Sequence, residues 1–269
     1  MNCYVFITDE NCKDFAQIAI RSLLEQNPKH DVLVYTTVDL GIPGIKQIYI
    51  KLDEINYDIK DLTVKNLPVL AYRIKLLDEL KNKYDKIMMV DTDMIFRSNI
   101  DYLFDLSDTK ILGRDEIVLH KDSRKRMNNN LWYDTEIYLN SGLLVIPASL
   151  LKEHNLYQEF IHELDIRAEK YICPEQDFIN YTFRDSLQDI GYYINCFVTN
   201  TVAKNFDKVQ VIHYCGQGKP LRIMPVLMQA AKIFFDVFEI YLEKFKEFIS
   251  EDFYQKHKEV LKNKELPEF

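Results

Sequence analysis

The amino-terminal third of the chain alternates short apolar runs with amphipathic helical patterns, and this alternation constrains the fold more than any other feature. Strand-like apolar runs occupy residues 3–8, 32–35, 47–51 and 86–90. Helical spacing of apolar residues covers residues 12–26 and 69–80. Strands and helices that alternate in this way indicate α/β units around a largely parallel sheet.

Composition limits the classes of function. A chain of 269 residues with 47% hydrophobic residues can bury a large core. The formal charge of -8 argues against nucleic-acid or anionic-membrane partners, which attract a basic surface. Five scattered cysteines without a CxxC pair fit neither a disulfide framework nor a zinc knuckle. With no signal-like or membrane-spanning segment visible, we expect a cytoplasmic protein with reduced thiols.

The remaining segments do not follow this alternation of strands and helices. Residues 113–136 carry mixed charges, and we expect a long mobile loop that is either a substrate lid or a solvated surface. A strand is predicted at residues 136–139 and continues at 143–146, and the small residues between them favour close approach of a ligand. From Pro225 onward, an aromatic stripe at helical spacing indicates packing on the core or on a second subunit, with a partner or membrane surface as the alternative.

Asp91 and Asp93 flank Thr92 directly after the apolar run 86–90. Open α/β sheets bind their ligands at this end of a strand. Carboxylates one residue apart on an extended segment can project to the same side, and a Mg²⁺ or Mn²⁺ ion that holds substrate phosphates needs such clustered oxygens. A DxD pair alone is weak evidence, because many such pairs are turn or capping residues.

A second candidate site lies in residues 211–220. His213 ends a short apolar run and can offer a ring nitrogen to Mn²⁺, while Gly216 and Lys219 can approach and neutralise phosphates. A lone histidine after a strand is more often structural. The segment is not a P-loop, because the glycine spacing differs and Pro220 replaces the usual Ser or Thr.

A third candidate site is the segment 174–177, which reads Pro-Glu-Gln-Asp and opens a predicted helix. Glu175 and Gln176 could serve in a site. The same residue types are also ordinary helix-start signals, so simple capping is the alternative interpretation.

Taken in order, these segments resemble glycosyltransferase family 8, the group that contains glycogenin and bacterial lipopolysaccharide galactosyltransferases. The resemblance runs through residues 6–11, 73–76, 90–93, 139–142, 175–177, 213–216 and 219–220. It implies a GT-A fold, with a Rossmann-like nucleotide-binding half and a mixed central sheet over residues 1–222, followed by a helical extension at 223–269. It also implies retaining transfer of glucose or galactose from a UDP-sugar, with Mn²⁺ or Mg²⁺, to a glycan or protein acceptor.

The same resemblance assigns roles to individual residues. Asp91, Asp93 and His213 would bind the metal, and Gln176 and Glu175 would be catalytic. Contacts with the nucleotide-sugar would come from these residues and from Thr8, Asp9, Arg73, Thr92, Asp115, Asn140, Ser141, Gly216 and Lys219. The chain departs from the family pattern at Cys12 and Leu221, where aromatic residues are common, and at Glu175, where Asp is common.

Three other functions stay open at this point. A nucleotidyltransferase also clusters carboxylates around metals, but the sequence shows no third carboxylate on an obvious partner strand. A catalytically silent homologue could bind a UDP-sugar or glycan. A glycogenin-like enzyme would glucosylate its own tyrosine, yet the place nearest to that acceptor holds Cys196 and Phe197, so we expect a separate acceptor. A homodimer is also compatible with the sequence.

Overall fold

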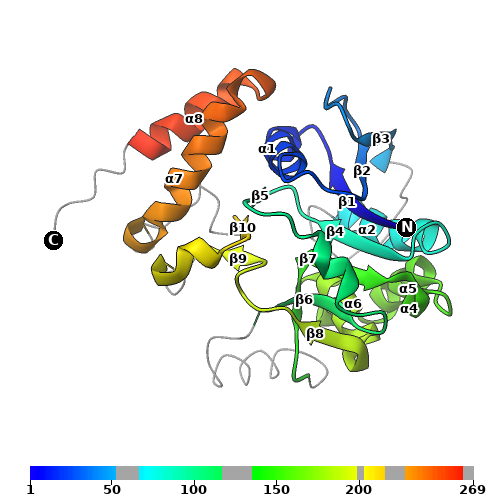
Figure 1. Ribbon diagram of the computed structural model, residues 1–269. Coiled ribbons are helices and arrows are strands. Elements are labelled where there is room, and N and C mark those ends of the chain that lie inside the picture. The colour runs from blue at the N-terminus through cyan, green and yellow to red at the C-terminus, as the bar shows by residue number, and fades with distance from the viewer. Residues whose placement is uncertain (53–66, 117–134, 199–202, 216–227, 263–269) are drawn as a thin grey trace.

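The structure is a computed structural model that describes residues 1–52, 67–116, 135–198, 203–215 and 228–262 (Figure 1). Its largest element is a seven-stranded sheet in the order β3-β2-β1-β4-β7-β6-β8. A three-stranded sheet, β5-β10-β9, lies between the large sheet and a pair of carboxyl-terminal helices. This mixed α/β architecture is the fold class that the sequence predicts.

The amino-terminal half confirms the predicted alternation. It comprises β1 (Asn2–Thr8), α1 (Lys13–Leu24), β2 (Asp31–Thr36), β3 (Lys46–Tyr49), α2 (Leu67–Leu80) and β4 (Lys86–Val90). Strands β3, β2, β1 and β4 are parallel, so their carboxyl ends share one edge of the sheet. The loops after β1 and β4 therefore meet at that edge, where ligands bind in this class of fold.

The central part of the chain adds β6 (Ile111–Asp115), β7 (Leu139–Pro147) and β8 (Leu187–Asp189). β7 runs antiparallel to both β4 and β6, and β8 is parallel to β6, which makes the sheet mixed. Short helical segments around them are η2 (Asp101–Asp105), α4 (Ala148–Leu151), η3 (Ala168–Lys170), η4 (Arg184–Ser186) and η5 (Ala203–Lys208).

Two sequence expectations in this region need correction in their bounds. The loop predicted at 113–136 begins inside β6, and residues 117–134 lie outside the described part of the chain. The strand predicted at 136–139 starts only at Leu139 and continues unbroken through residues 140–142. β7 pairs with β4 on one side and β6 on the other, and this two-sided pairing overrides the local signal of its small polar residues.

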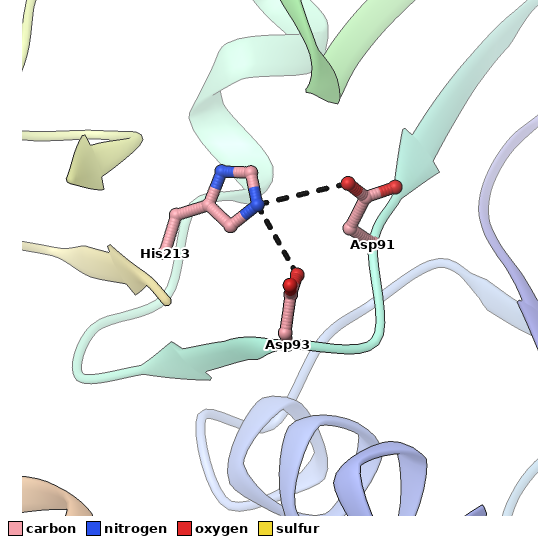
Figure 2. Close-up of side chains that lie close together, drawn as sticks. All are labelled: Asp91, Asp93 and His213. Atoms are coloured by element: carbon pink, nitrogen blue, oxygen red, sulfur yellow. Dashed lines mark ion pairs between the residues drawn. The ribbon is translucent and has the colours of Figure 1, made fainter. Parts of the chain in front are cut away.

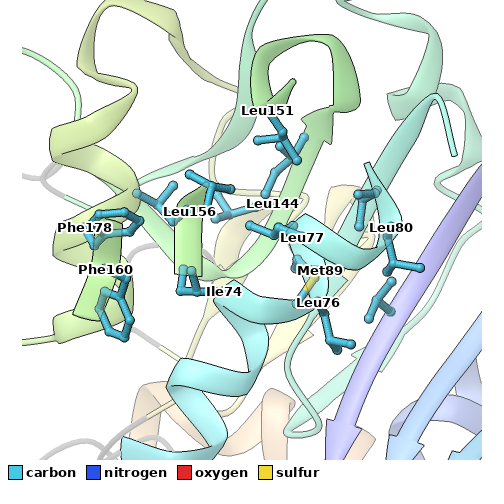
Figure 3. Packing of buried hydrophobic residues seen from close by; sticks show 14 of the residues in the cluster. Ile74, Leu76, Leu77, Leu80, Met89, Leu144, Leu151, Leu156, Phe160 and Phe178 are labelled. Atoms are coloured by element: carbon cyan, nitrogen blue, oxygen red, sulfur yellow. The ribbon is translucent and has the colours of Figure 1, made fainter. Parts of the chain in front are cut away.

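Helices cover both faces of the large sheet. One face packs against α2, α4, α5 (Leu156–Arg167) and α6 (Pro174–Thr182), with Leu77, Met89, Leu144 and Phe160 in the shared core (Figure 3). The opposite face packs against α1 and η2. α6 begins at Pro174 as predicted, which brings Glu175 and Gln176 close to Ser141 in β7.

The small sheet consists of β5 (Met94–Phe96), β9 (Cys196–Phe197) and β10 (Val211–His213). β10 is antiparallel to β5 and parallel to β9. Since β5 follows β4 after only three residues, the short turn 91–93 joins the two sheets. His213 at the end of β10 is thereby held opposite that turn.

The carboxyl-terminal helices are α7 (Met228–Lys244) and α8 (Glu251–Lys262), joined by η9 (Lys246–Phe248). The aromatic stripe predicted to pack on the core does so: Phe234, Phe235 and Phe238 are buried against α1 and the small sheet. The boundary between residues 222 and 223 stays a prediction. None of the helices in the described ranges is long and apolar enough to cross a membrane.

Candidate active site

Asp91, Asp93 and His213 converge at the junction of the two sheets (Figure 2). Asp91 directly follows β4, Asp93 directly precedes β5, and His213 ends β10. His213 Nε2 lies 3.1 Å from Asp93 Oδ1 and 3.6 Å from Asp91 Oδ2. One ligand atom from each residue can be chosen so that all three lie within 4.8 Å of one another. The three residues that the sequence singles out as metal ligands therefore form one cluster.

The donor set fits a divalent cation. His213 is 1% exposed, and its Nε2 atom makes no hydrogen bond within the described residues. A buried ring nitrogen without a hydrogen bond is costly unless something else satisfies it. An imidazole nitrogen and two carboxylates, one of them 31% exposed, offer the N and O atoms that Mn²⁺ accepts.

Gly142 in β7 makes room for the histidine ring. A Cβ atom at this position would lie 2.3 Å from His213 Cε1 and 2.9 Å from His213 Nδ1. The small residues here predict space for a ligand, whereas next to Gly142 that space holds the His213 imidazole. The backbone O of Gly142 also accepts a hydrogen bond from Asp91 N at 2.8 Å. Gly142 thus contacts two members of the cluster.

Gly142→Ala is therefore expected to displace the His213 ring and to lower Mn²⁺ affinity at least about tenfold. Overpacking should also lower the free energy of unfolding by about 1–3 kcal/mol. Gly113→Ala is the matched control: the atoms nearest to its Cβ would be side-chain atoms of Leu144 and Leu139 in the same sheet, and none of the nearest belongs to the cluster. Calorimetry with Mn²⁺ and thermal unfolding of both variants check this. Equal Mn²⁺ affinity in the two variants would remove the role assigned to Gly142.

Arg73 of α2 binds Oδ1 of Asp91, whereas His213 lies near Oδ2 of the same carboxylate. Its guanidinium donates to Asp91 Oδ1, to Glu175 Oε1 at 2.8 Å and to Ser141 O at 2.7 Å. Burial by itself would lower the pKa of Arg73, but Glu175 and Asp91 raise it, so the guanidinium stays charged. Burial raises the pKa of Glu175, and Arg73 opposes that rise. The predicted phosphate contact of Arg73 stays a prediction, and its contacts here position Asp91.

Gln176 lies in a hydrogen-bonded network next to the cluster of Asp91, Asp93 and His213. Its Oε1 accepts from Ser141 N at 2.8 Å and from Asn140 Nδ2 at 3.3 Å. Its Nε2 donates to Glu116 Oε2 at 2.7 Å and to the hydroxyl of Tyr138 at 3.0 Å. Burial raises the pKa of Glu116, and the hydrogen bond from Gln176 opposes this. The structure thus brings Asn140, Ser141, Glu175 and Gln176 together as expected.

Glu116 and Asn195 also belong to this site and were not predicted from the sequence. Asn195 Oδ1 lies 2.9 Å from His213 Nδ1 although Asn195 is 18 residues away along the chain. One signal was available for it: a single asparagine interrupts the apolar residues Ile194, Cys196 and Val198. A polar residue within such a run implies a buried hydrogen-bond partner. Glu116 carries no comparable signal, since it simply follows Asp115.

The other predicted residues lie around this centre or outside the described chain. Thr8 is buried at the end of β1, and the Asp9 carboxylate accepts from Cys12 N and from the Asn11 amide. Thr92 lies between the two aspartates. The Asp115 carboxylate accepts from Tyr138 N at 3.2 Å, which closes the irregular β6–β7 pairing. Gly216 and Lys219 lie outside the described residues.

A comparison with protein families identifies the chain. Residues 3–222 match the sequence model of glycosyl transferase family 8. The chain belongs to this family. It is a glycosyltransferase.

Curated relatives of this family 8 protein are distant in sequence. An uncharacterized protein, R707, of Acanthamoeba polyphaga mimivirus is 26% identical over 213 residues, which is 74% of each chain. Galactinol synthase 4 of Arabidopsis thaliana is 27% identical over 162 residues, 52% of this chain and 47% of the synthase. The chain thus matches about half the length of such plant enzymes.

Solved structures show the same fold. The galactosyltransferase LgtC, determined with donor and acceptor sugar analogs, superposes with a TM-score of 0.65 at 19% identity and covers 95% of this chain and 100% of its own. The glycosyltransferase GlyE of Streptococcus pneumoniae gives a TM-score of 0.58 at 16% identity, over 91% of this chain and 63% of GlyE. These similarities confirm the GT-A-like fold of the family 8 protein.

Proposed function

We propose that the protein is a metal-dependent, retaining hexosyltransferase that takes glucose or galactose from a UDP-sugar and passes it to a glycan or protein acceptor. The observation that carries this proposal is the cluster of Asp91, Asp93 and His213 at the carboxyl end of β4 in a family 8 chain. The name galactinol synthase, borne by several relatives, and the galactosyltransferase LgtC support a hexose as the transferred group. Retention follows from the family resemblance.

Charge supports a cation in this site. The Asp91 and Asp93 carboxylates both approach His213 at the junction, and Arg73 pairs with Asp91 and Glu175. These carboxylates would repel a diphosphate unless a cation were bound. A divalent ion held by Asp91, Asp93 and His213 would supply positive charge to the departing diphosphate. Arg73 keeps Asp91 oriented, and the network around Gln176 holds polar groups beside the cluster.

A donor screen tests the proposal. The protein is incubated with UDP-glucose, UDP-galactose or UDP-N-acetylglucosamine, with and without Mn²⁺, and the released products are identified. Release of UDP from a UDP-hexose only with the metal is the expected result. In a parallel incubation with UTP and a hexose 1-phosphate, release of pyrophosphate would indicate a nucleotidyltransferase instead. Binding of the donor without any product under all conditions would indicate a silent homologue.

The acceptor is expected to be a separate molecule. Cys196 is fully buried, and the neighbouring Tyr192 and Tyr193 contact each other through their hydroxyls at 3.1 Å. Phe197, at the place nearest to the acceptor of a glycogenin-like enzyme, packs its ring against that of His213 at a centroid distance of 5.5 Å. Cytoplasmic location and dimerisation stay predictions.

After incubation with UDP-glucose and Mn²⁺, intact-mass measurement should therefore show no hexose added to the protein. A donor analogue that cannot transfer its sugar provides the baseline. A ladder of hexose additions on the wild-type chain would replace this expectation with self-glucosylation, and peptide mapping would then locate the modified tyrosine.

A further inference from the structure

Asn195 links the candidate metal site to the backbone of β7. Its side chain is fully buried, with Oδ1 at 2.9 Å from His213 Nδ1 and Nδ2 at 3.1 Å from Asn140 Oδ1. Asn140 Oδ1 in turn accepts from Gly142 N at 3.0 Å. Two side chains, those of Asn140 and Asn195, therefore connect a backbone N–H group of β7 to the imidazole ring.

The direction of these hydrogen bonds is fixed by that backbone group. Because an N–H group can only donate, Asn140 must present its carbonyl oxygen to Gly142. Asn195 must then turn its amide nitrogen toward Asn140 and its carbonyl oxygen toward His213. An oxygen that only accepts requires a proton on His213 Nδ1. In the neutral ring this leaves Nε2 with a lone pair directed at the two aspartates.

Asn195 and Asp93 favour different positions for the proton on the His213 ring. Asp93 Oδ1 lies 3.1 Å from Nε2, so without a metal the carboxylate favours a proton on Nε2. Asn195 favours a proton on Nδ1 instead. A lone pair on Nε2 is what a metal ion needs from a histidine ligand. The contacts of Asn195 therefore prepare the ring for the cation at the expense of a direct hydrogen bond to Asp93.

Arg114 holds the backbone of Asn195 in place. Arg114 in β6 is 3% exposed and donates from Nη1 to Asn195 O at 2.8 Å. The same guanidinium lies 3.7 Å from the centre of the Phe197 ring, two residues further along the chain. These two contacts anchor the segment 195–197 against the large sheet, so that the Asn195 side chain keeps its position between Asn140 and His213.

We propose that Asn195 is a positioning residue that sets the tautomer and ring orientation of His213 for metal binding. The proposal rests on the metal site of the proposed function. Partners that hold the second nitrogen of a metal-bound histidine typically contribute 10- to 100-fold to metal affinity. Asn195 contacts neither of the aspartates in the described hydrogen bonds, so its influence passes through His213.

The test compares two substitutions of similar size, Asn195→Leu and Asn195→Asp. Leucine removes the acceptor for His213 Nδ1–H, and Mn²⁺ affinity measured by calorimetry should fall about 10- to 100-fold. Aspartate keeps an oxygen toward the ring, so its Mn²⁺ affinity should lie closer to that of wild type than to that of Asn195→Leu. A purely structural role for Asn195 predicts no such rescue.

Histidine nitrogen-15 spectra of the metal-free protein at mildly alkaline pH give an independent readout. The chain has six histidines, and comparison with His213→Gln assigns the signals of His213. We expect the Nδ1–H tautomer in wild type and in Asn195→Asp, and a shift toward Nε2–H in Asn195→Leu. Asn180→Leu is the control, because Asn180 is equally buried and its side-chain hydrogen bonds to the described residues go to the backbone of Leu139 and Gln176.

An Nε2–H tautomer in wild type would overturn the proposal, as would wild-type Mn²⁺ affinity in Asn195→Leu. Loss of the tautomer in Asn180→Leu would assign the effect to general destabilisation. Failure of the proposed function is distinguishable from these results. A wild-type protein that binds Mn²⁺ with the Nδ1–H tautomer but releases no UDP would refute the function and leave the role of Asn195 intact.

Discussion

Asp93→Asn is expected to weaken Mn²⁺-dependent UDP binding more than about 100-fold, beyond the range seen for residues that only support a metal ligand. The substitution removes a carboxylate whose Oδ1 lies 3.1 Å from His213 Nε2. The fold should survive, because asparagine is nearly isosteric and the backbone O of Asp93 still accepts from Tyr214 N. Calorimetry with Mn²⁺ and UDP, together with thermal unfolding, separates the two effects.

Asp185→Asn provides the control for this change. It removes the same charge at an exposed position in η4, and its affinities should match those of wild type. His213→Ala should weaken binding less than Asp93→Asn, since two carboxylates remain. Unchanged Mn²⁺ and UDP affinities in both Asp93→Asn and His213→Ala would contradict the metal assignment.

Gln176→Ala is expected to lower turnover about 100-fold, the scale of removing one preorganised polar group from an active site. Donor affinity should change far less, because the Gln176 side chain bonds Ser141, Asn140, Glu116 and Tyr138 but none of the three candidate metal ligands. Separate measurement of kcat and of the donor Kd distinguishes the two effects.

Gln17→Ala is the matched control for Gln176→Ala. Both glutamines are 7% exposed, and Gln17 in α1 donates to Leu40 O at 2.6 Å, away from the site. Thermal unfolding shows whether both variants lose similar stability. If kcat and donor affinity fall equally in Gln176→Ala, the residue serves binding. A normal rate would return it to the helix-start role that Pro174 and Asp177 already fill.

The parts of the fold that depend on local pattern were predictable from the sequence. The alternation in residues 3–90 follows from side-chain periodicity, and it gives β1, α1, β2, β3, α2 and β4. Asp91, Asp93 and His213 were predictable because each lies next to an apolar run, at the point where a strand ends or begins. The helix at Pro174 carries its own start signal.

The missed features depend on pairing between distant segments. β6 and the unbroken β7 exist because β4, β7 and β6 hydrogen-bond side by side, which no local window records. A side chain at position 142 would clash with His213, which lies 71 positions further along the chain. Asn195 donates a hydrogen bond to Asn140 across 55 residues. Such contacts become visible only once the sheet order is known.

Hexose transfer by this family 8 chain is proposed to need a metal held by Asp91, Asp93 and His213. UDP release from UDP-glucose and UDP-galactose is measured after chelation of metals and during titration with Mn²⁺, in wild type and in Asp93→Asn. We predict that wild-type activity is lost on chelation and restored by Mn²⁺ in a saturable way, and that Asp93→Asn stays inactive over the same range. Wild-type activity that persists after complete chelation, or an Asp93→Asn variant restored by the same Mn²⁺ concentration, would contradict metal-dependent transfer at this site.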